Sequence, residues 1–499
     1  MEVKFEKQVL SCLDLCLRED RSSEETLEIR IPEGMPDAGK ILAAWGQPLL
    51  RSKEWRSDRI VCTAGMMLWV LYQPESGGMP QCLDGWVSHT LRWDLPRDCR
   101  EGEFRVDLGT RFVDARIASA RKIMVRAGLG AEAQAWVPME AELYTPGKVP
   151  EEIQLLRKKY PLRLIRKTGE KAFTVEQTLD LPASAPRPNK IVHYSLSPSV
   201  SEKKLVANKL VFRGNGDLHL LYLTEDGQLH TWESPVAFSQ YAELDGSYGH
   251  SAEGDVTIAV TTLEVELDDG GCLRTKCAMT GQYIISEQSS AEIVTDAYVP
   301  GRDVRVKKQE LSVPVLLDTW QESVDIRQEL TGQADVLIET WTTGENLRQR
   351  PMEDRIRLEF PGHLHALYQE VDESVSSSSG RFEGGVTLKA DPGCMVSVRR
   401  LPVPEPQLTL GADSMDVRIQ LPVQLTAFRK ELLEPVVAVE VGETKEPAPD
   451  RPSLILRRVG EEGLWEVAKS AGSTVEAIQK ANGLQEEPDP GRLLLIPVS

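Results

Sequence analysis

The beginning of the chain lacks the uninterrupted apolar segment of a secretion signal, because charged residues already stand at positions 2, 4, 6 and 7. No later stretch approaches the roughly 20 consecutive apolar residues that cross a bilayer. The eight cysteines, spread between positions 12 and 394, do not have the density of a disulfide framework. These absences predict a cytoplasmic chain in a reducing compartment, without a transmembrane segment.

Positive charge is also scarce. The 499 residues include 58 Lys and Arg against 77 Asp and Glu, which gives a formal net charge of −19. Binding to nucleic acid or to an anionic membrane needs a cationic surface, so this balance argues against both as general partners. The acidic excess mainly implies solubility.

A catalytic constellation is missing as well. The sequence contains no nucleophile elbow, no phosphate-binding loop and no paired set of metal ligands. Among the seven histidines, His363 and His365 form a close pair, but no third ligand lies near them in sequence. Two cysteine pairs also lack partners at ligand spacing; they are Cys12 with Cys16 and Cys272 with Cys277. We therefore predict no enzymatic activity, no cofactor and no metal site.

An internal repeat is present instead. Three segments with a shared apolar pattern end in tyrosine: MMLWVLY at 66–72, GDLHLLY at 216–222 and GHLHALY at 362–368. These tyrosines stand 150 and then 146 residues apart. Two copies also close with Tyr, Pro and Gly in step, as YTPGK from Tyr144 and YVPGR from Tyr298. His219 and His365 share a position that is Trp69 in the first copy, which argues against a metal site common to the copies.

The local texture within a copy is β. Period-two alternation, as in VTIAVTTLEVEL at 256–267, is interrupted by turn clusters such as EDGQ at 225–228. Alternation buries one face of each strand, as in antiparallel sheets packed in pairs. We predict a mainly β protein with three tandem, sandwich-like antiparallel β domains, arranged as beads. The tyrosines of the repeat are predicted to pack in the cores, together with Trp69, Trp86 and Trp232.

The C-terminal part of the sequence has a different pattern. After a charged, proline-bearing linker at 439–453, strand, helix, helix and strand follow one another. The expected elements are strands at 454–458 and 492–497 and a first helix at 463–471. Ser473 is expected to cap the second helix, with Glu476 completing a capping box. Asn482 and Gly483 are expected to end that helix.

This segment, from Leu454 to Ser499, resembles the LysM domain, a small βααβ fold. The resemblance is carried by Leu464, Trp465 and Ala468, by Val475 and Ile478, by the turn from Asn482 to Leu484, and by Pro490, Gly491, Leu495, Ile496 and Pro497. In that family a shallow groove between two loops holds N-acetylated sugars. By resemblance, the residues that would bind a ligand or partner here are Glu461, Glu462, Gly463, Leu464, Trp465, Asn482, Gly483 and Leu484.

The groove departs from the family pattern at its first loop. LysM domains commonly carry Gly, Asp and then Ser or Thr before the Leu, where this chain has Glu461, Glu462 and Gly463. An added carboxylate suits a basic protein surface better than a neutral sugar. A folded spacer without a ligand is the other interpretation. Trp465 is expected to be either the anchor beside the groove or a core residue.

A basic patch lies between the first two copies. Residues 155–171 hold seven basic residues and one acid. On an acidic chain such a patch is a candidate docking site for an acidic partner. Its residues are Arg157, Lys158, Lys159, Arg163, Arg166 and Lys167. An exposed strand edge guarded by lysine and arginine gives the same pattern, and both interpretations stay open.

The whole chain resembles the SPOCS-domain proteins, and most closely the SipL-like spore coat morphogenetic proteins. The resemblance rests on ETLEIRIPEGMPDAGKIL at 25–42, on EQTLDLPASAPRPNKIV at 176–192, on the tyrosine segments and on the YVPG ending. The corresponding division is 1–145 for the first SPOCS-like repeat with its N-terminal strand, 146–305 for the basic connector and second repeat, 306–438 for a divergent third repeat, 439–453 for the linker and 454–499 for the LysM domain.

The resemblance implies a non-enzymatic scaffold in the mother-cell cytoplasm, at the surface of the developing forespore. It would tether the basement layer of the spore coat, built by a morphogenetic ATPase, through protein contacts of the LysM and β domains. One rival is a protein that binds peptidoglycan at the cell wall or spore cortex, which needs an export route. The other is an enzyme that uses the LysM domain as a substrate anchor, which needs a catalytic constellation.

Overall fold

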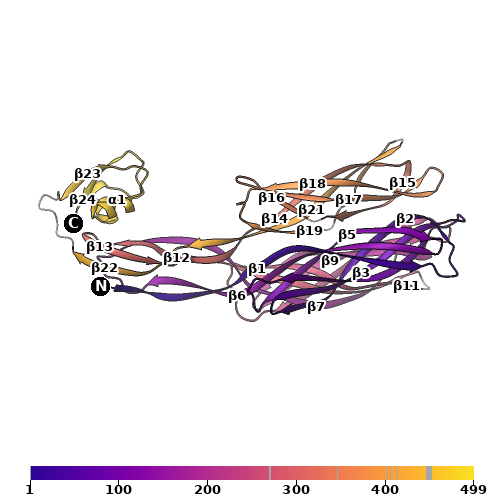
Figure 1. The fold of residues 1–499 in the computed structure, drawn as a ribbon, viewed down its shortest axis with the longest axis horizontal. Coiled ribbons are helices and arrows are strands. Elements are labelled where there is room, and N and C mark those ends of the chain that lie inside the picture. The colour runs from indigo at the N-terminus through magenta and orange to yellow at the C-terminus, as the bar shows by residue number, and fades with distance from the viewer. Residues whose placement is uncertain are drawn as a thin grey trace.

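The computed structural model describes residues 2–268, 271–345, 347–401, 403–404, 406–411, 413–444 and 452–498. These ranges contain 24 β-strands and two α-helices, so the prediction of a mainly β protein is confirmed. Figure 1 shows a broad head of packed sheets, a narrow stalk of paired strands and a small module at the far end of the stalk. Within the described ranges, neither helix is long and apolar enough to cross a membrane.

The same strand order recurs three times in the head and stalk. The first repeat contains β1 (Glu2–Arg30), β2 (Ala38–Arg56), β3 (Arg59–Pro74), β4 (Gln81–Asp94), β5 (Glu103–Ser119) and β6 (Lys122–Pro146). The second contains β7 (Gln154–Leu179), β8 (Lys190–Val206), β9 (Lys209–Leu223), β10 (Leu229–Glu243), β11 (Ala252–Leu267) and β12 (Leu273–Tyr298). The third contains β14 (Leu311–Thr331), β15 (Ala334–Gly344), β16 (Arg348–Pro351), β17 (Ile356–Glu370), β18 (Val375–Leu388), β19 (Met395–Arg400), β20 (Gln407–Leu410) and β21 (Ser414–Leu433).

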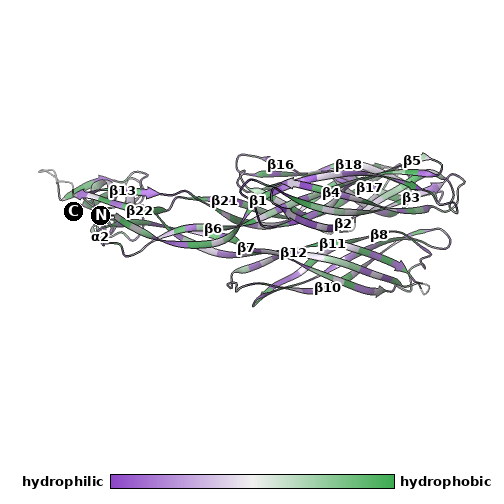
Figure 2. Ribbon diagram, turned by 60° about the horizontal axis from the view of Figure 1, so that its bottom comes forward, coloured by the Kyte–Doolittle hydropathy of each residue, from purple (hydrophilic) through white to green (hydrophobic). Residues whose placement is uncertain are grey.

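Each repeat is built from two antiparallel sheets. One is a meander, in the order β2-β3-β4, β8-β9-β10, or β17 flanked by β15, β16 and β18. The other joins the two long outer strands, in the order β1-β6-β5, β7-β12-β11 or β14-β21-β19. Hydrophobic and hydrophilic residues alternate along the strands in Figure 2. The apolar faces of the two sheets meet in one core for each repeat, as the period-two pattern predicts.

The repeated tyrosines hold equivalent places in the three cores. Tyr72 is fully buried and its hydroxyl donates to the carbonyl of Pro36 at 3.0 Å. Tyr222 donates to the carbonyl of Pro186 at the same distance, again 36 residues upstream. In the third repeat the residue 36 positions upstream is Gly332, and the Tyr368 hydroxyl lies against it. Their burial confirms that the tyrosines pack in the cores.

The predicted tryptophans differ from one another in burial. Trp69 is buried and Trp232 is half-buried against the core of the second repeat, but Trp86 is 40 % exposed. The prediction of a core position for Trp86 is therefore wrong. Trp86 lies on the outward face of β4, where its ring covers the glycine of the neighbouring strand, Gly65, and lies under the guanidinium of Arg51 at 5.4 Å.

Three two-stranded ribbons extend from the head and form the stalk. The ribbons are β1 with β6, β7 with β12, and β14 with β21. Each long first strand carries a β-bulge at the same relative place, at Cys16, Arg166 and Leu317. Bulges bend a strand and increase its twist, so they mark the point at which the ribbons leave the head. The stalk has its own apolar core, with Ala141, Leu164 and Val313 each contributed by a different ribbon.

The three repeats pack against one another around a ring of buried glutamines. Gln134 of the first repeat donates to Ser397 of the third. Gln282 of the second repeat bonds to the backbone of Val106 in the first, at 2.9 and 3.0 Å. Gln424 of the third repeat donates to Asp255 of the second at 3.4 Å. The arrangement predicted as separate beads is therefore wrong, because polar contacts close the repeats into a bundle.

Two further strands close the far end of the stalk. β22 (Val436–Thr444) pairs with the start of β1 and with β13 (Arg302–Lys308). The predicted linker at 439–453 therefore begins inside a strand, since its valines at 439 and 441 are buried between β1 and β13. The part of the linker at 445–451 lies outside the described residues.

The C-terminal module has the element order that was expected. β23 (Leu454–Arg458) pairs antiparallel with β24 (Leu493–Pro497), and α1 (Leu464–Ala471) and α2 (Val475–Asn482) lie between them in the chain. Gly483 ends α2 with φ of 61°, as its position predicted. The predicted cap is wrong by one residue. The hydroxyl of Thr474 accepts from Ala477 N at 3.1 Å, whereas Ser473 is buried against the stalk.

Candidate binding sites

The eight predicted groove residues do not form one open surface. Leu464 is fully buried in the core of the module. The side-chain amide of Asn482 is hydrogen-bonded within the module. It donates to the carbonyls of Ile478 at 2.8 Å and Leu495 at 2.6 Å and accepts from Leu495 N at 2.8 Å. These bonds tie the end of α2 to β24. Neither side chain is free to contact a ligand.

The glutamates that replace the usual groove residues differ in exposure. Glu461, Gly463 and Gly483 are exposed, and Glu462 and Leu484 are half-buried. The Glu462 carboxylate pairs with Arg457 at 2.7 Å, and the same guanidinium donates to Ser470 at 3.0 Å. One of these two carboxylates is therefore held within the module, and Glu461 is the one that faces solvent.

Trp465 lies at the contact between the module and the stalk. Its indole Nε1 donates to Asp296 Oδ2 at 2.8 Å, and its ring packs edge-on against Tyr298 with centroids 4.8 Å apart. Lys469 bonds to the same carboxylate oxygen at 2.6 Å. The Tyr298 hydroxyl donates to the carbonyl of Ser473 at 3.0 Å. Trp465 is thus an anchor, but one that binds the stalk of its own chain.

The ionisation of this contact favours docking at neutral pH. Burial acts to raise the pKa of Asp296, but the hydrogen bonds from Lys469 and Trp465 outweigh burial and hold that pKa below its usual value. Burial raises the pKa of Tyr298 to about 12. A charged carboxylate therefore accepts both bonds while a neutral phenol donates its own.

The predicted basic patch lies on β7, where most of its charges have acidic neighbours. Arg157 and Lys159 pair with Glu292 at 3.3 and 3.6 Å. The other pairs are Arg163 with Glu253, Arg166 with Glu287 at 3.3 Å and Lys167 with Asp245 at 3.8 Å. Lys158 lies over the ring of Tyr160 at 4.9 Å. β7 lies at the edge of its sheet, so this pattern favours the interpretation of a guarded strand edge.

The module exposes an apolar surface on its two-stranded sheet. Leu454, Leu456 and Leu493 are 49, 62 and 51 % exposed. They lie on paired strands, since Leu454 and Leu456 belong to β23 and Leu493 to β24. We call these three residues the leucine face. Clustered exposed leucines on a soluble protein are typical of a contact surface for another protein.

A cavity of about 1150 Å³ lies where the three repeats meet. Each repeat contributes a large side chain to its wall: Trp45 from the first, His219 from the second and Trp341 from the third. Trp45 and Trp341 pack against each other with ring centroids 5.2 Å apart. The cavity is therefore a common feature of the bundle rather than of one repeat.

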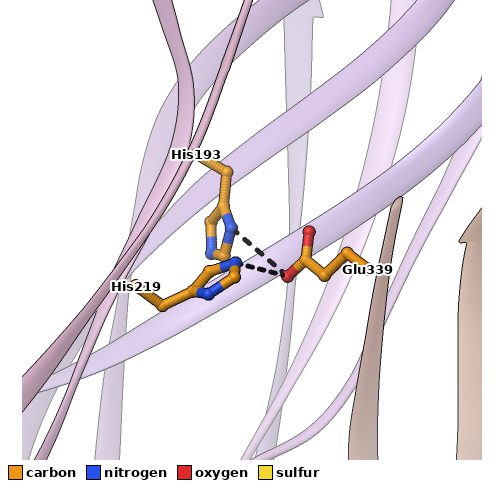
Figure 3. A group of neighbouring side chains, drawn as sticks. All are labelled: His193, His219 and Glu339. Atoms are coloured by element: carbon orange, nitrogen blue, oxygen red, sulfur yellow. Dashed lines mark ion pairs between the residues drawn. The ribbon is translucent and has the colours of Figure 1, made fainter. Parts of the chain in front are cut away.

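Three polar side chains converge at this junction, as Figure 3 shows. His193 lies on β8, His219 on β9 and Glu339 on β15. Glu339 Oε1 is 3.2 Å from His219 Nε2 and 3.9 Å from His193 Nδ1. All three potential ligand atoms lie within 4.8 Å of one another. The sequence predicted no metal site, yet this geometry is one in which two imidazoles and a carboxylate could hold an ion.

The two histidines differ in protonation. Burial and the neighbouring His219 lower the pKa of His193 well below its usual value. Burial also acts to lower the pKa of His219, but hydrogen bonds to Glu233 and Glu339 outweigh it and raise that pKa to about 9. At neutral pH, without an ion, His193 is therefore neutral and His219 is protonated between two carboxylates.

Sequence reasoning missed this cluster because its members are distant in the chain. His193 and His219 are 26 residues apart, and Glu339 is 120 residues further on. No spacing rule covers ligands that come from the strands of two different repeats. The available signal was His219, whose repeat position relates it to His365 and gives no reason to pair it with Glu339.

The fold defines a class: a bundle of mainly β repeats on a stalk, with a small module at the far end of the stalk. Residues 188–268 match the family described as SipL, SPOCS domain. The match covers β8 to β11, and the same strand order recurs as β2 to β5. It supports a SipL-like, sporulation-related protein. No curated protein and no solved structure matches the chain.

Proposed function

We propose that this chain is a non-enzymatic scaffold of spore coat assembly, which tethers the basement layer of the coat to the forespore surface. The observation that carries the proposal is the SPOCS-domain match of residues 188–268, within a strand order that the chain repeats three times. Scaffolds act by holding partners at a fixed separation. The long stalk between head and module suits that task (Figure 1).

Two separate ends would let the protein hold two partners. The leucine face lies on the module, whereas the head presents the outer faces of three repeats. Several weak contacts on one chain strengthen one another through effective concentration. On this proposal, a coat protein such as the morphogenetic ATPase would bind at the module end.

Protein contact is favoured over sugar binding by the state of the groove. Leu464 is a core residue, Asn482 is bonded inside the module and Trp465 is bonded to Asp296 of the stalk. A sugar groove needs free hydrogen-bonding groups and an open aromatic surface. The leucine face instead offers apolar area, which suits a protein surface.

A localisation experiment tests the proposed role. A fluorescent fusion of the full chain is expected to form a ring around the forespore during sporulation. Even fluorescence throughout the mother cell, or a signal in vegetative cells, would contradict a tether at that surface.

A binding experiment tests the proposed surface. The full chain is used as bait in a lysate of sporulating cells and, separately, mixed with purified peptidoglycan. Leu456→Ser is expected to reduce recovery of a coat protein at least tenfold, while Leu410→Ser, at an exposed leucine of the head, leaves it unchanged. Strong cosedimentation with peptidoglycan and no coat partner would instead favour glycan binding.

A further inference from the structure

The junction cluster contains polar atoms that the described residues leave without hydrogen bonds. His193 and Glu339 are 5 and 7 % exposed. Among the described residues, His193 Nδ1 and Glu339 Oε2 are buried atoms without a hydrogen-bond partner. His219 Nε2 faces the Glu339 carboxylate, 3.2 Å from its Oε1. Each buried polar group of this kind costs about 1 to 3 kcal/mol, so two in one cluster need a cause.

The surroundings hold both imidazole rings in place. The ring of His193 stacks on Trp45 with centroids 4.9 Å apart and an interplanar angle of 9°, and Trp69 lies edge-on to it at 5.0 Å. His219 Nδ1 lies 3.3 Å from Glu233 Oε1. A carboxylate on the far nitrogen is the usual outer partner of a metal-binding histidine, because it fixes the ring and makes the other nitrogen a better ligand.

We propose that His193 Nδ1, His219 Nε2 and Glu339 together bind one divalent transition-metal ion of the zinc class. Two imidazoles and one carboxylate form a ligand set that zinc accepts, with tetrahedral bonds of about 2.0 to 2.2 Å. Ligands on such bonds lie roughly 3.3 to 3.5 Å apart. The observed distances of 3.2 and 3.9 Å to Glu339 Oε1 are close to this spacing, and all three ligand atoms lie within 4.8 Å of one another.

The protein also offers a reason for such an ion to be there. His193 and His219 belong to the second repeat, and Glu339 to the third. An ion held by all three would add a link between two repeats that are also joined by bonds such as Gln369 to Gln228 at 3.3 Å and Arg399 to Thr257 at 2.6 Å. Zinc bound by three protein ligands keeps a fourth position, which here would face the cavity.

An ion pair without a metal accounts for only part of the cluster. A protonated His219 contacts both Glu233 and Glu339, but its single positive charge balances only one of the two carboxylates. It leaves His193 Nδ1 buried and unpaired beside a positive ring. A bound cation would take the place of the proton between His219 Nε2 and Glu339 and would also use His193 Nδ1.

Metal uptake by the full-length protein tests the proposal. The chain is stripped with EDTA, dialysed against Zn²⁺ or Co²⁺, and assayed for metal by mass spectrometry. We expect about one ion per chain, visible absorption typical of tetrahedral Co²⁺, and a rise in Tm that EDTA reverses. Mg²⁺ and Ca²⁺ are not expected to be retained, because they prefer oxygen ligands. Failure of the wild-type chain to take up Zn²⁺ or Co²⁺ would overturn the proposal without involving any variant.

Three variants assign the ion to this cluster. His193→Gln and Glu339→Gln are each expected to weaken Co²⁺ binding at least tenfold and to abolish the tetrahedral absorption. His365→Gln is the matched control, because His365 holds the place of His219 in the third repeat and bonds to Thr343 instead. Far-UV circular dichroism checks that each variant is folded. Unchanged uptake in both ligand variants would place the ion elsewhere, for example on a cysteine, and would refute this site.

Discussion

Replacing Gln282 with leucine is expected to weaken the contact between the first and second repeats. Gln282 is 1 % exposed. Its Oε1 accepts from Val106 N and from Lys53 Nζ, both at 3.0 Å, and its Nε2 donates to Val106 O at 2.9 Å. Leucine has a similar volume but cannot form these bonds. Lys53 keeps its ion pair with Glu170 at 2.9 Å. The backbone N–H and C=O of Val106, however, lose the bonds that Gln282 makes to them.

The magnitude follows from those two groups. A buried N–H or C=O left without its partner costs about 1 to 3 kcal/mol, so Gln282→Leu is expected to cost about 2 to 6 kcal/mol. Native proteins are stable by about 5 to 15 kcal/mol, so this is a large part of the total. With a urea dependence of about 1 to 3 kcal/mol per molar, a loss of 4 kcal/mol lowers the unfolding midpoint by more than roughly 1 M.

The assay is urea unfolding followed by tryptophan fluorescence. A chain of several repeats need not unfold in one step, so each resolved transition is fitted separately. Gln177→Leu is the control, because Gln177 is an exposed glutamine on β7 of the same repeat. A loss in Gln282→Leu no larger than the roughly 0.5 kcal/mol typical of surface changes would refute the idea that the glutamine ring joins the repeats.

Three further predictions concern the stalk contact, the repeat cores and the thiols. The pKa of Asp296 is lowered in the docked state, so the contribution of this carboxylate to docking is present above its ordinary pKa near 3.8 and is lost as the pH falls through the lowered value. The indole N–H resonance of Trp465, assigned with Trp465→Phe, is therefore expected to titrate below pH 3.8. A higher midpoint would contradict the bond between Trp465 and Asp296. Tyr72→Phe removes the buried bond to Pro36 and is expected to cost about 0.5 to 1.5 kcal/mol in urea unfolding, whereas no loss would show that the hydroxyl is not bonded. Burial raises the pKa of Cys82 to about 12, so this thiol is expected to resist alkylation at pH 8 until urea unfolds the chain; rapid labelling of the native protein, located by peptide mass mapping, would disprove its burial.

The repeat could be predicted from sequence because its signals are local. Alternating residues define strands, and the tyrosines at 72, 222 and 368 mark the same core position in each copy. The bundling of the repeats could not be predicted. It depends on single residues such as Gln134 and Gln424, which have no periodic pattern and whose partners lie in another repeat. The bulges at Cys16, Arg166 and Leu317 have no common residue type either.

The candidate sites were predictable to a smaller extent. The element order of the module follows from short-range helix and turn signals. The partner of Trp465 does not, because Asp296 precedes it by 169 residues. Nothing in the sequence indicates that Trp465, predicted as a possible anchor, contacts the stalk of its own chain.

The repeats differ from one another at the junction, and this asymmetry is what makes the histidine cluster possible. Trp69, His219 and His365 hold one repeat position, and the residues paired with them across the strands are Trp45, Ser195 and Trp341. A strict threefold repeat would place three identical pairs at the junction, which would pack as an apolar core or repel as three histidines. Serine is much smaller than tryptophan, so Ser195 in the second repeat leaves space at the cavity wall that a tryptophan would fill. His219 can then reach the carboxylate of the third repeat, while the tryptophans of the other two repeats hold the remaining rings in place. The divergence that makes the third copy hard to recognise from sequence therefore supplies the one acidic group that the cluster needs.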